Sequence, residues 1–302
     1  MIPVDWPALA FRPPSAVNRL RRGSCACPLA LRDAVGGLLG EALTIPLVAA
    51  PSVAVASAAL VAAKEARSVL GLSLPEGEGP EGWFEAVTGV ADELAPGLPL
   101  LLGATVALRP DPVGEGRAAR HLQRLVEAGF THLALDLDLL PPERRAEELA
   151  RVAEPALERG LGVECLLPAG GELLPDPSEV AGLLGELGSL GAAPDLAGVR
   201  YGRGGAAGAD ALLSRLAELE EAAAGVALSL RGAAPRVLRF VGASLLRAAD
   251  DAGAAAAAAA ASADPVRAEA RAYAEAAALL DAVPAEGSAV ALSQALGRAR
   301  EE

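Results

Sequence analysis

Three acidic residues stand at the ends of two neighbouring apolar runs and are the first candidates for chemistry in this chain. Asp136 and Asp138 close one run, and Glu164 lies in the next. If the runs are adjacent parallel strands, two of these carboxylates could share a proton or hold a hard cation such as Mg²⁺. Roles as acid and base would require surroundings that separate their pKa values. The alternative is that they are solvated or paired with nearby arginines.

A glycine-rich loop that carries an arginine is the best candidate for a ligand site. It spans residues 201–205, after an apolar run at residues 197–201. Glycines let backbone N–H groups approach an anion, and a guanidinium adds a forked, charge-assisted contact. The candidate phosphate-binding residues are Gly202, Arg203, Gly204, Gly205, Arg231, Gly232 and Arg247. A tight turn without a ligand is the alternative interpretation.

Several other chemistries lack the residues they require. Lys64 is the single lysine and falls in a predicted helix, so a Schiff-base mechanism has no nucleophile at a strand end. Ser73 and Ser229 have no histidine beside them to act as a base. The two histidines, His121 and His132, fall on a helix face and near a strand start, and we expect both to be structural or surface residues.

Composition narrows the class of protein. A formal net charge of −13 argues against nucleic acid as a partner, because binding a phosphate backbone requires clustered Lys and Arg. The three cysteines are an odd number and form no disulfide framework, which favours a reducing, cytoplasmic compartment. Cys25 and Cys27 are interpreted as ordinary buried thiols, with a metal site as the alternative. No metal or other cofactor is predicted.

No targeting or membrane segment is predicted. The first residues hold several prolines and arginines but no continuous apolar core of a signal peptide. An uncharged run at residues 42–63 has the length of a membrane span, but Pro46 and Pro51 interrupt it. The preferred interpretation is a buried parallel strand at residues 45–50 followed by a helix at 53–67.

That strand and helix begin a repeat of about eight units. Strands are predicted at residues 45–50, 68–74, 98–108, 131–137, 161–167, 197–201, 225–230 and 243–248. Helices are predicted between them at residues 53–67, 80–94, 116–128, 141–159, 176–190, 209–223 and 235–241. This alternation favours parallel pairing and closure into a (β/α)8 TIM barrel, an α/β fold, with a doubly wound open sheet as the alternative. Alanine-rich helices are predicted to follow the barrel.

The predicted organisation has one large domain with short additions. Residues 1–40 form a Pro- and Arg-rich segment with a leading helix, residues 41–285 form the barrel, and residues 286–302 form a C-terminal tail. A barrel of this size buries a core without disulfides or metals. Its active site would be built at the C-terminal ends of the strands.

Four local stretches resemble the class II, zinc-dependent fructose-bisphosphate and tagatose-bisphosphate aldolases. They are the helix and strand at residues 58–74, the Ala-Gly-Phe-Thr segment and its aspartate at 127–136, the Arg-Gly-x-Gly-Val-Glu segment at 159–164, and the Gly-Gly-Glu at 170–172. The resemblance covers about residues 46–283. It implies a TIM barrel and an ancestry in metal-dependent aldol chemistry.

The zinc site of that family is not carried over. Where the family has His-x-Asp-His at the end of strand three, this chain has Gly103-Ala104-Thr105-Val106. The resemblance places Leu166 at the zinc-binding acid, Gly204 or Gly205 at the strand-six histidine, and Arg231 at the strand-seven histidine. A catalytic zinc needs three protein ligands, so the resemblance implies a degenerate member that lacks the metal.

Three functions remain open at this point. The first is a non-catalytic barrel that acts as an accessory subunit of a catalytic aldolase, or that associates with itself, through its alanine-rich helices. The second is a lyase or isomerase acting on a phosphorylated sugar through Asp136, Asp138 or Glu164. The third is a module that binds a sugar phosphate without converting it.

Overall fold

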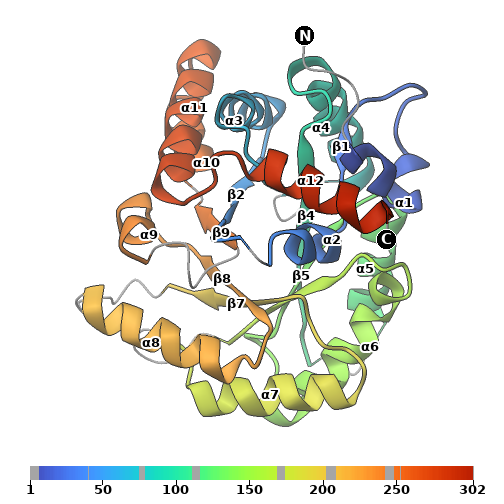
Figure 1. Cartoon of the computed structure of the whole chain (residues 1–302), viewed down its shortest axis with the longest axis vertical. Coiled ribbons are helices and arrows are strands. Elements are labelled where there is room, and N and C mark those ends of the chain that lie inside the picture. The colour runs from blue at the N-terminus through green and yellow to red at the C-terminus, as the bar shows by residue number, and fades with distance from the viewer. Residues whose placement is uncertain are drawn as a thin grey trace.

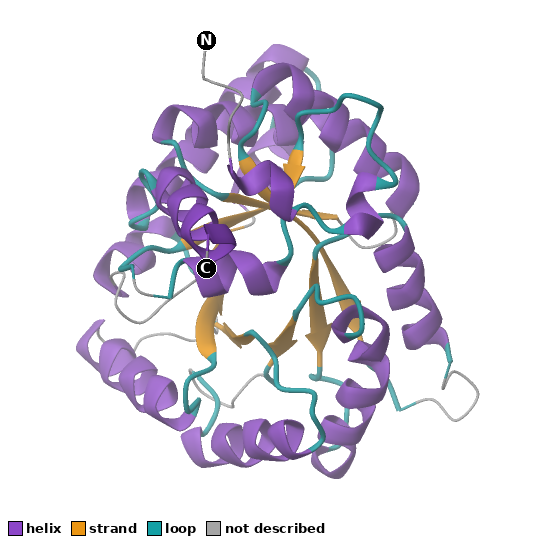
Figure 2. Ribbon diagram, turned by 45° about the vertical axis from the view of Figure 1, so that its right-hand side comes forward, coloured by secondary structure: helices purple, strands orange, loops and turns teal. Residues whose placement is uncertain are grey.

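The structure is a computed structural model that describes residues 7–39, 41–74, 79–110, 116–168, 174–201, 209–241, 248–251 and 253–301. Parallel strands form the centre of the molecule and helices surround them (Figure 1; Figure 2). The strands are β1 (Cys27–Pro28), β2 (Ile45–Ala49), β3 (Leu70–Leu74), β4 (Pro99–Ala107), β5 (His132–Asp136), β6 (Val163–Leu166), β7 (Leu196–Arg200), β8 (Ala227–Arg231) and β9 (Ala248–Asp251).

The sheet closes on itself. Its order is β1-β4-β3-β2-β9-β8-β7-β6-β5, and an additional pairing joins β4 to β5, so β2 to β9 form an eight-stranded barrel. All the pairings are parallel. The predicted (β/α)8 TIM barrel is therefore confirmed.

The helices lie between the strands and after the last one. They are η1 (Pro7–Phe11), α1 (Pro14–Val17), α2 (Leu31–Gly37), α3 (Val53–Ala66), α4 (Pro80–Leu94), α5 (Arg117–Glu127), η2 (Pro142–Arg144), α6 (Arg145–Leu157), α7 (Pro177–Ser189), α8 (Ala209–Ala222), α9 (Pro235–Val241), α10 (Gly253–Ala260), α11 (Pro265–Ala282) and α12 (Ser288–Glu301). Local chemistry sets several of their starts. Ser52 and Asp264 accept hydrogen bonds from backbone N–H groups of the first turns of α3 and α11, and Pro265 occupies the first turn of α11.

One predicted strand extends further than expected. The apolar stretch at residues 243–248 predicts the last strand; residues 243–247 lie outside the described residues, and β9 runs from Ala248 to Asp251. β9 pairs with β2 from Ile45↔Ala248 to Val48↔Asp251. Asp250 and Asp251 have poor intrinsic strand propensity, and their pairing with Leu47 and Val48 of β2 outweighs this local preference.

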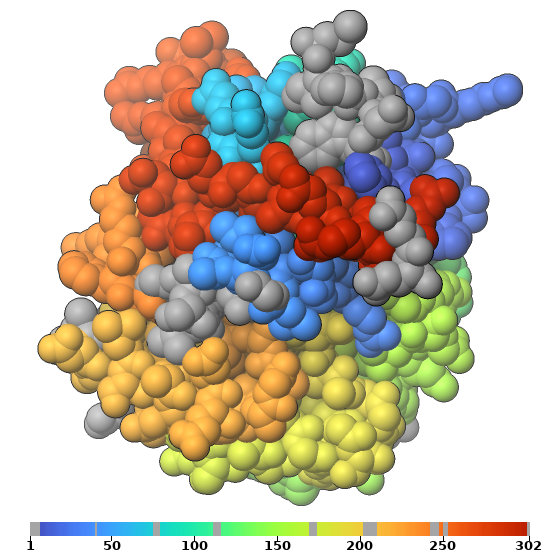
Figure 3. Space-filling view, in the orientation of Figure 1, coloured from blue at the N-terminus to red at the C-terminus, as the bar shows by residue number. Residues whose placement is uncertain are grey.

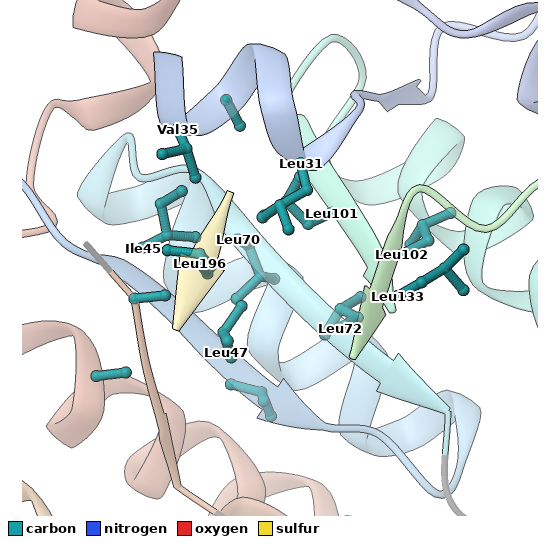
Figure 4. Packing of buried hydrophobic residues seen from close by; sticks show 14 of the residues in the cluster. Leu31, Val35, Ile45, Leu47, Leu70, Leu72, Leu101, Leu102, Leu133 and Leu196 are labelled. Atoms are coloured by element: carbon teal, nitrogen blue, oxygen red, sulfur yellow. The ribbon is translucent and has the colours of Figure 1, made fainter. Parts of the chain in front are cut away.

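The N-terminal segment covers the end of the barrel where the strands begin. β1 pairs with the first residues of β4, before β4 pairs with β5 at Gly103. α2 then packs under the barrel, with its Leu31 N–H donating to the carbonyl of Thr131. Leu31 and Val35 of α2 face the buried leucines of the strands (Figure 4).

The C-terminal helices complete this end of the molecule. α12 packs against α2 and η1, and α11 packs against α3. Figure 3 shows the C-terminal residues, in red, lying over this face beside the N-terminal segment in blue. No helix among the described residues combines the length and the apolar content that crossing a bilayer requires.

Candidate functional site

The polar residues inside the barrel lie in two layers. Side chains alternate along a strand, so His132 and Asp136 of β5 share a face, as do Gly198 and Arg200 of β7. Side-chain hydrogen bonds that join His132 to Glu164, and Arg200 to Asp136, show that this shared face is the barrel interior. We call the deeper group around Glu164 the inner layer, and the group around Arg200 the mouth.

The inner layer is centred on the carboxylate of Glu164, whose side chain is fully buried. His132 Nε2 lies 2.6 Å from Oε2, and Arg231 Nε donates to Oε1 at 2.9 Å. Arg231 Nη2 donates to Oε2, and Ser229 Oγ donates to Oε1. A carboxylate offers about four acceptor positions, and these four contacts fill them.

Electrostatics hold Glu164 in its charged form. Burial by itself would raise its pKa, but the Arg231 guanidinium, followed by the hydrogen bond and charge of His132, outweighs burial and lowers the pKa below its ordinary value. The carboxylate can only accept, so His132 presents a protonated Nε2 to it. Glu164 is thus fixed as an anion by three neighbours from two other strands.

Two glycines make room for the inner layer. A Cβ at Gly198 would lie 2.5 Å from Glu164 Oε1 and 3.1 Å from Ser229 Oγ. A Cβ at Gly103 would lie 3.1 Å from His132 Nδ1. The absence of a side chain at these positions lets neighbouring strands bring their polar groups together.

The mouth holds a second ion pair, which is more exposed. Arg200 at the end of β7 binds the Asp136 carboxylate through Nη2, with side-chain exposures of 29% and 17%. Arg200 Nη1 lies 3.9 Å from Asp138 Oδ2, is itself buried, and has no hydrogen-bond partner among the described residues. Arg200 Nη1 is thus held near the Asp138 carboxylate by charge alone, without a hydrogen bond to the described residues.

Register explains why the two layers remain separate. Arg200 and Arg231 are paired across β7 and β8, so the two cations lie side by side. Each turns to a different carboxylate, Arg200 to Asp136 and Arg231 to Glu164. The predicted cluster of three acids is thus divided: Asp136 and Asp138 lie beside Arg200, whereas Glu164 belongs to the inner layer.

The candidate phosphate-binding residues are only partly described. Gly202, Arg203, Gly204, Gly205 and Arg247 lie outside the described residues. Gly232 follows β8 with φ +74°, and Arg231 is directed inward to Glu164. Their role in binding a phosphate stays a prediction.

His132 was the residue that sequence reasoning set aside and the structure brings to the inner layer. It does begin β5, as its position in the apolar run indicates, but its side chain is 5% exposed and contacts Glu164 on the neighbouring strand β6. His121 lies on the exposed side of α5, away from this network. The register Ala134↔Glu164 between β5 and β6 is the signal that would have paired His132 with Glu164, and it requires the tertiary structure.

The residues in the described part of the barrel do not fit a catalytic zinc ion. Within the described ranges, no three or more His, Cys, Asp or Glu side chains gather as a metal site. The positions that the sequence resemblance assigns to zinc ligands hold Gly103–Val106, Leu166 and Arg231, of which Arg231 brings a positive charge to the centre of the barrel. Cys27 is also unsuited, because burial raises its pKa to about 12 despite the nearby Arg12. Cys25, predicted to be a buried thiol, is only partly buried.

Comparison with known proteins bears on the fold. No protein-family model matches the sequence, and no curated protein matches it. Among solved structures, the YdjI aldolase of Escherichia coli K12 is similar with a TM-score of 0.69 at 15% identity, covering 87% of this chain and 99% of that one. The chain has the fold of this aldolase.

Two further solved structures have a similar fold. A protein from Coccidioides immitis assigned as a fructose-1,6-bisphosphate aldolase has a TM-score of 0.63 at 16% identity, covering 89% of this chain and 99% of that one. A protein from Sinorhizobium meliloti 1021 assigned as a tagatose 6-phosphate kinase has a TM-score of 0.55 at 16% identity, covering 85% of this chain and 98% of that one. At such identities, the similarity establishes the fold alone.

Proposed function

We propose that this chain is a non-catalytic barrel of the class II aldolase type that binds a phosphorylated sugar at its mouth. The observation that carries this proposal is the saturation of Glu164 by Arg231, His132 and Ser229. A general acid or base needs a proton that it can gain or lose near neutral pH. Glu164 has a lowered pKa and no unfilled acceptor position, so it is suited to structure rather than proton transfer.

The residues at the positions expected for zinc ligands also support a non-catalytic barrel. Aldol cleavage in the family that the sequence resembles depends on zinc, and this chain places a guanidinium where a zinc-binding histidine would stand. A cation inside the barrel disfavours a second cation nearby. We therefore assign no metal-dependent step to these residues.

Binding of an anion is supported by Arg200. One of its terminal nitrogens is occupied by Asp136 and the other has no hydrogen-bond partner in the described part of the chain. A buried donor without a partner is costly, and a phosphate oxygen would satisfy it. Arg203, which lies outside the described residues, is predicted from the sequence to add a second guanidinium.

The test combines a catalytic assay with a binding assay. We expect purified protein to contain no stoichiometric zinc and to show no cleavage of fructose 1,6-bisphosphate or tagatose 1,6-bisphosphate with zinc supplied. We expect the same compounds to raise the melting temperature, with unphosphorylated fructose as the control. Arg200→Gln and Arg203→Ala should abolish that rise, whereas Arg271→Gln on the exposed side of α11 should leave it unchanged. Zinc-dependent cleavage would overturn the proposal, as would the absence of any ligand-dependent shift.

An accessory role is the second candidate, and it has one supporting observation. α10 consists of glycine and alanine, with Ala256, Ala259 and Ala260 exposed, and Val266 near the start of α11 is 78% exposed. These residues offer an uncharged surface for a catalytic aldolase subunit or a second copy of the chain. Co-elution with such a subunit, lost in a Val266→Glu variant, would support this role. A monomer that elutes alone in its presence would contradict it.

A further inference from the structure

A pocket of about 330 Å³ lies on the outside of the barrel, between α6 and α7. Its apolar part includes Leu167, Val180 and Leu183. Arg145 of α6 lines it, as do Glu179 and Glu186 of α7. A volume near 300 Å³ is at the lower end of the range for small-molecule sites, and apolar walls with a few charged groups are typical of them.

This pocket is separate from the barrel interior, because β6 lies between them. Glu164 and Leu166 of β6 face inward toward Gly198, so Cys165 and Leu167 face outward. Arg145 lies on this outer side, near Cys165. Burial raises the pKa of the Cys165 thiol, as do the charges of Glu164 and Asp136, whereas the charge of Arg145 lowers it. The inference drawn from this pocket does not rest on the proposed function.

The charged groups around the pocket form no ion pairs with other described residues. Arg145 Nε donates to the Leu140 carbonyl at 3.1 Å, which anchors the guanidinium. Its terminal nitrogens form no ion pair with the described residues, and neither does the carboxylate of Glu179 or Glu186.

Their arrangement separates the two signs of charge. Glu179, Leu183 and Glu186 follow a spacing of four and then three residues, which places them along one face of α7. Two turns of helix put the two glutamates about 10 Å apart along that face. Arg145 belongs to the other helix that lines the pocket, so an apolar floor lies among an anchored cation and two carboxylates.

We propose that this pocket binds a small zwitterion whose carboxylate contacts Arg145 and whose amine contacts one of the α7 glutamates, Glu179 or Glu186. The aliphatic body of the ligand would lie on Leu167, Val180 and Leu183. A guanidinium recognises a carboxylate with paired hydrogen bonds, and a glutamate carboxylate recognises an ammonium group by charge and hydrogen bonding. The chemical class is therefore an aliphatic amino acid or a similar compound with separated charges.

The test uses 6-aminohexanoate as the probe, with hexylamine and hexanoate as probes that carry one charge each. We expect saturable binding of 6-aminohexanoate in isothermal titration calorimetry of the full chain, at least about tenfold tighter than either single-charge probe. Such a difference corresponds to one additional charge-assisted hydrogen bond.

Variants assign the contacts. Arg145→Gln should weaken binding of 6-aminohexanoate about tenfold or more, and so should the double variant Glu179→Gln with Glu186→Gln. Arg271→Gln and Glu220→Gln are exposed substitutions elsewhere and should leave binding unchanged. Far-ultraviolet circular dichroism and the melting temperature establish that each variant is folded. Absence of saturable binding, equal binding of hexylamine, or unchanged binding by the folded pocket variants would overturn the proposal.

Discussion

The inner layer and the mouth of the barrel both hold an arginine against a carboxylate, but in different surroundings. Arg231 is 11% exposed and its partner Glu164 is fully buried, whereas Arg200 is 29% exposed and its partner Asp136 is 17% exposed. Glu164 has every acceptor position filled. Arg200 retains a nitrogen without a hydrogen-bond partner among the described residues.

The difference in exposure determines what each pair does. A buried ion pair contributes little net stability compared with an apolar core, but removal of one partner leaves a charge that the interior cannot solvate. A pair near solvent loses much less when it is broken, because water replaces the partner. We therefore expect the inner layer to maintain the fold and the mouth to interact with a ligand.

The largest expected effect comes from breaking the inner pair. Arg231→Met should lower the free energy of unfolding by about 3–5 kcal/mol, because Glu164 remains buried without its main cation. Chemical denaturation measures this loss. Adding Glu164→Leu to Arg231→Met should restore a large part of it. As a matched control, Arg239→Met breaks the exposed pair with Asp281 and should cost less than about 1 kcal/mol. Equal losses of unfolding free energy in Arg231→Met and Arg239→Met would show that the buried pair matters no more to stability than an exposed one.

The second effect tests whether the inner layer depends on the glycine that accommodates it. Gly198→Ala should lower the free energy of unfolding by about 1–3 kcal/mol, because the new methyl group would overlap Glu164 Oε1 and Leu166. Gly182→Ala in α7 is the control, since a Cβ there meets nothing within 4 Å. Helix propensity predicts a gain of about 0.5–1 kcal/mol for Gly182→Ala. A neutral Gly198→Ala would show that the inner layer is loosely packed.

The third effect is a dependence of stability on pH. The pKa of Glu164 is lowered in the folded state from an ordinary value of 4.5. Its stabilising contribution is therefore fully present above about pH 4.5 and is lost as the pH falls through the lowered, folded-state pKa. Urea denaturation at several pH values between 7 and 3 should show a steeper acid loss in the native chain than in the Arg231→Met, Glu164→Leu double variant. Parallel curves would mean that other carboxylates account for acid sensitivity.

The smallest effect on stability is expected at the mouth. Arg200→Gln should lower the free energy of unfolding by less than about 1 kcal/mol, because its pair is partly exposed. The same variant should weaken the binding of a phosphorylated sugar at least about tenfold. Denaturation and titration calorimetry on one preparation separate the two quantities. A large loss of stability with unchanged binding would reverse the roles assigned to the two layers.

Much of the secondary structure could be predicted from local patterns. The helices at residues 80–94 and 235–241 have the predicted bounds, since proline at the first turn and apolar spacing mark them. The last predicted strand ends at residue 248, whereas β9 continues to Asp251, because the aspartates of the paired segment give no apolar signal. Pairing with β2 and β8, rather than local apolarity, determines where that strand lies.

The site was harder to predict than the fold. Asp136, Asp138 and Glu164 could be selected from the sequence because acids at strand ends are conspicuous. The role of His132 could not, because a histidine at a strand start is expected to lie far from the functional end. Arg231 was selected as a phosphate ligand, whereas the structure shows its guanidinium bound to Glu164.

The sequence by itself determined the alternation of strands and helices, because hydrophobic periodicity and turn residues act over short distances. Closure of the sheet into a barrel was decided by the pairing of β4 with β5. The sequence also determined that few histidines, cysteines and lysines are available for catalysis. Only the tertiary structure decided which charges meet. Strand register brings His132, Glu164, Ser229 and Arg231 together across the barrel, and register depends on the packing of the whole sheet rather than on any one segment.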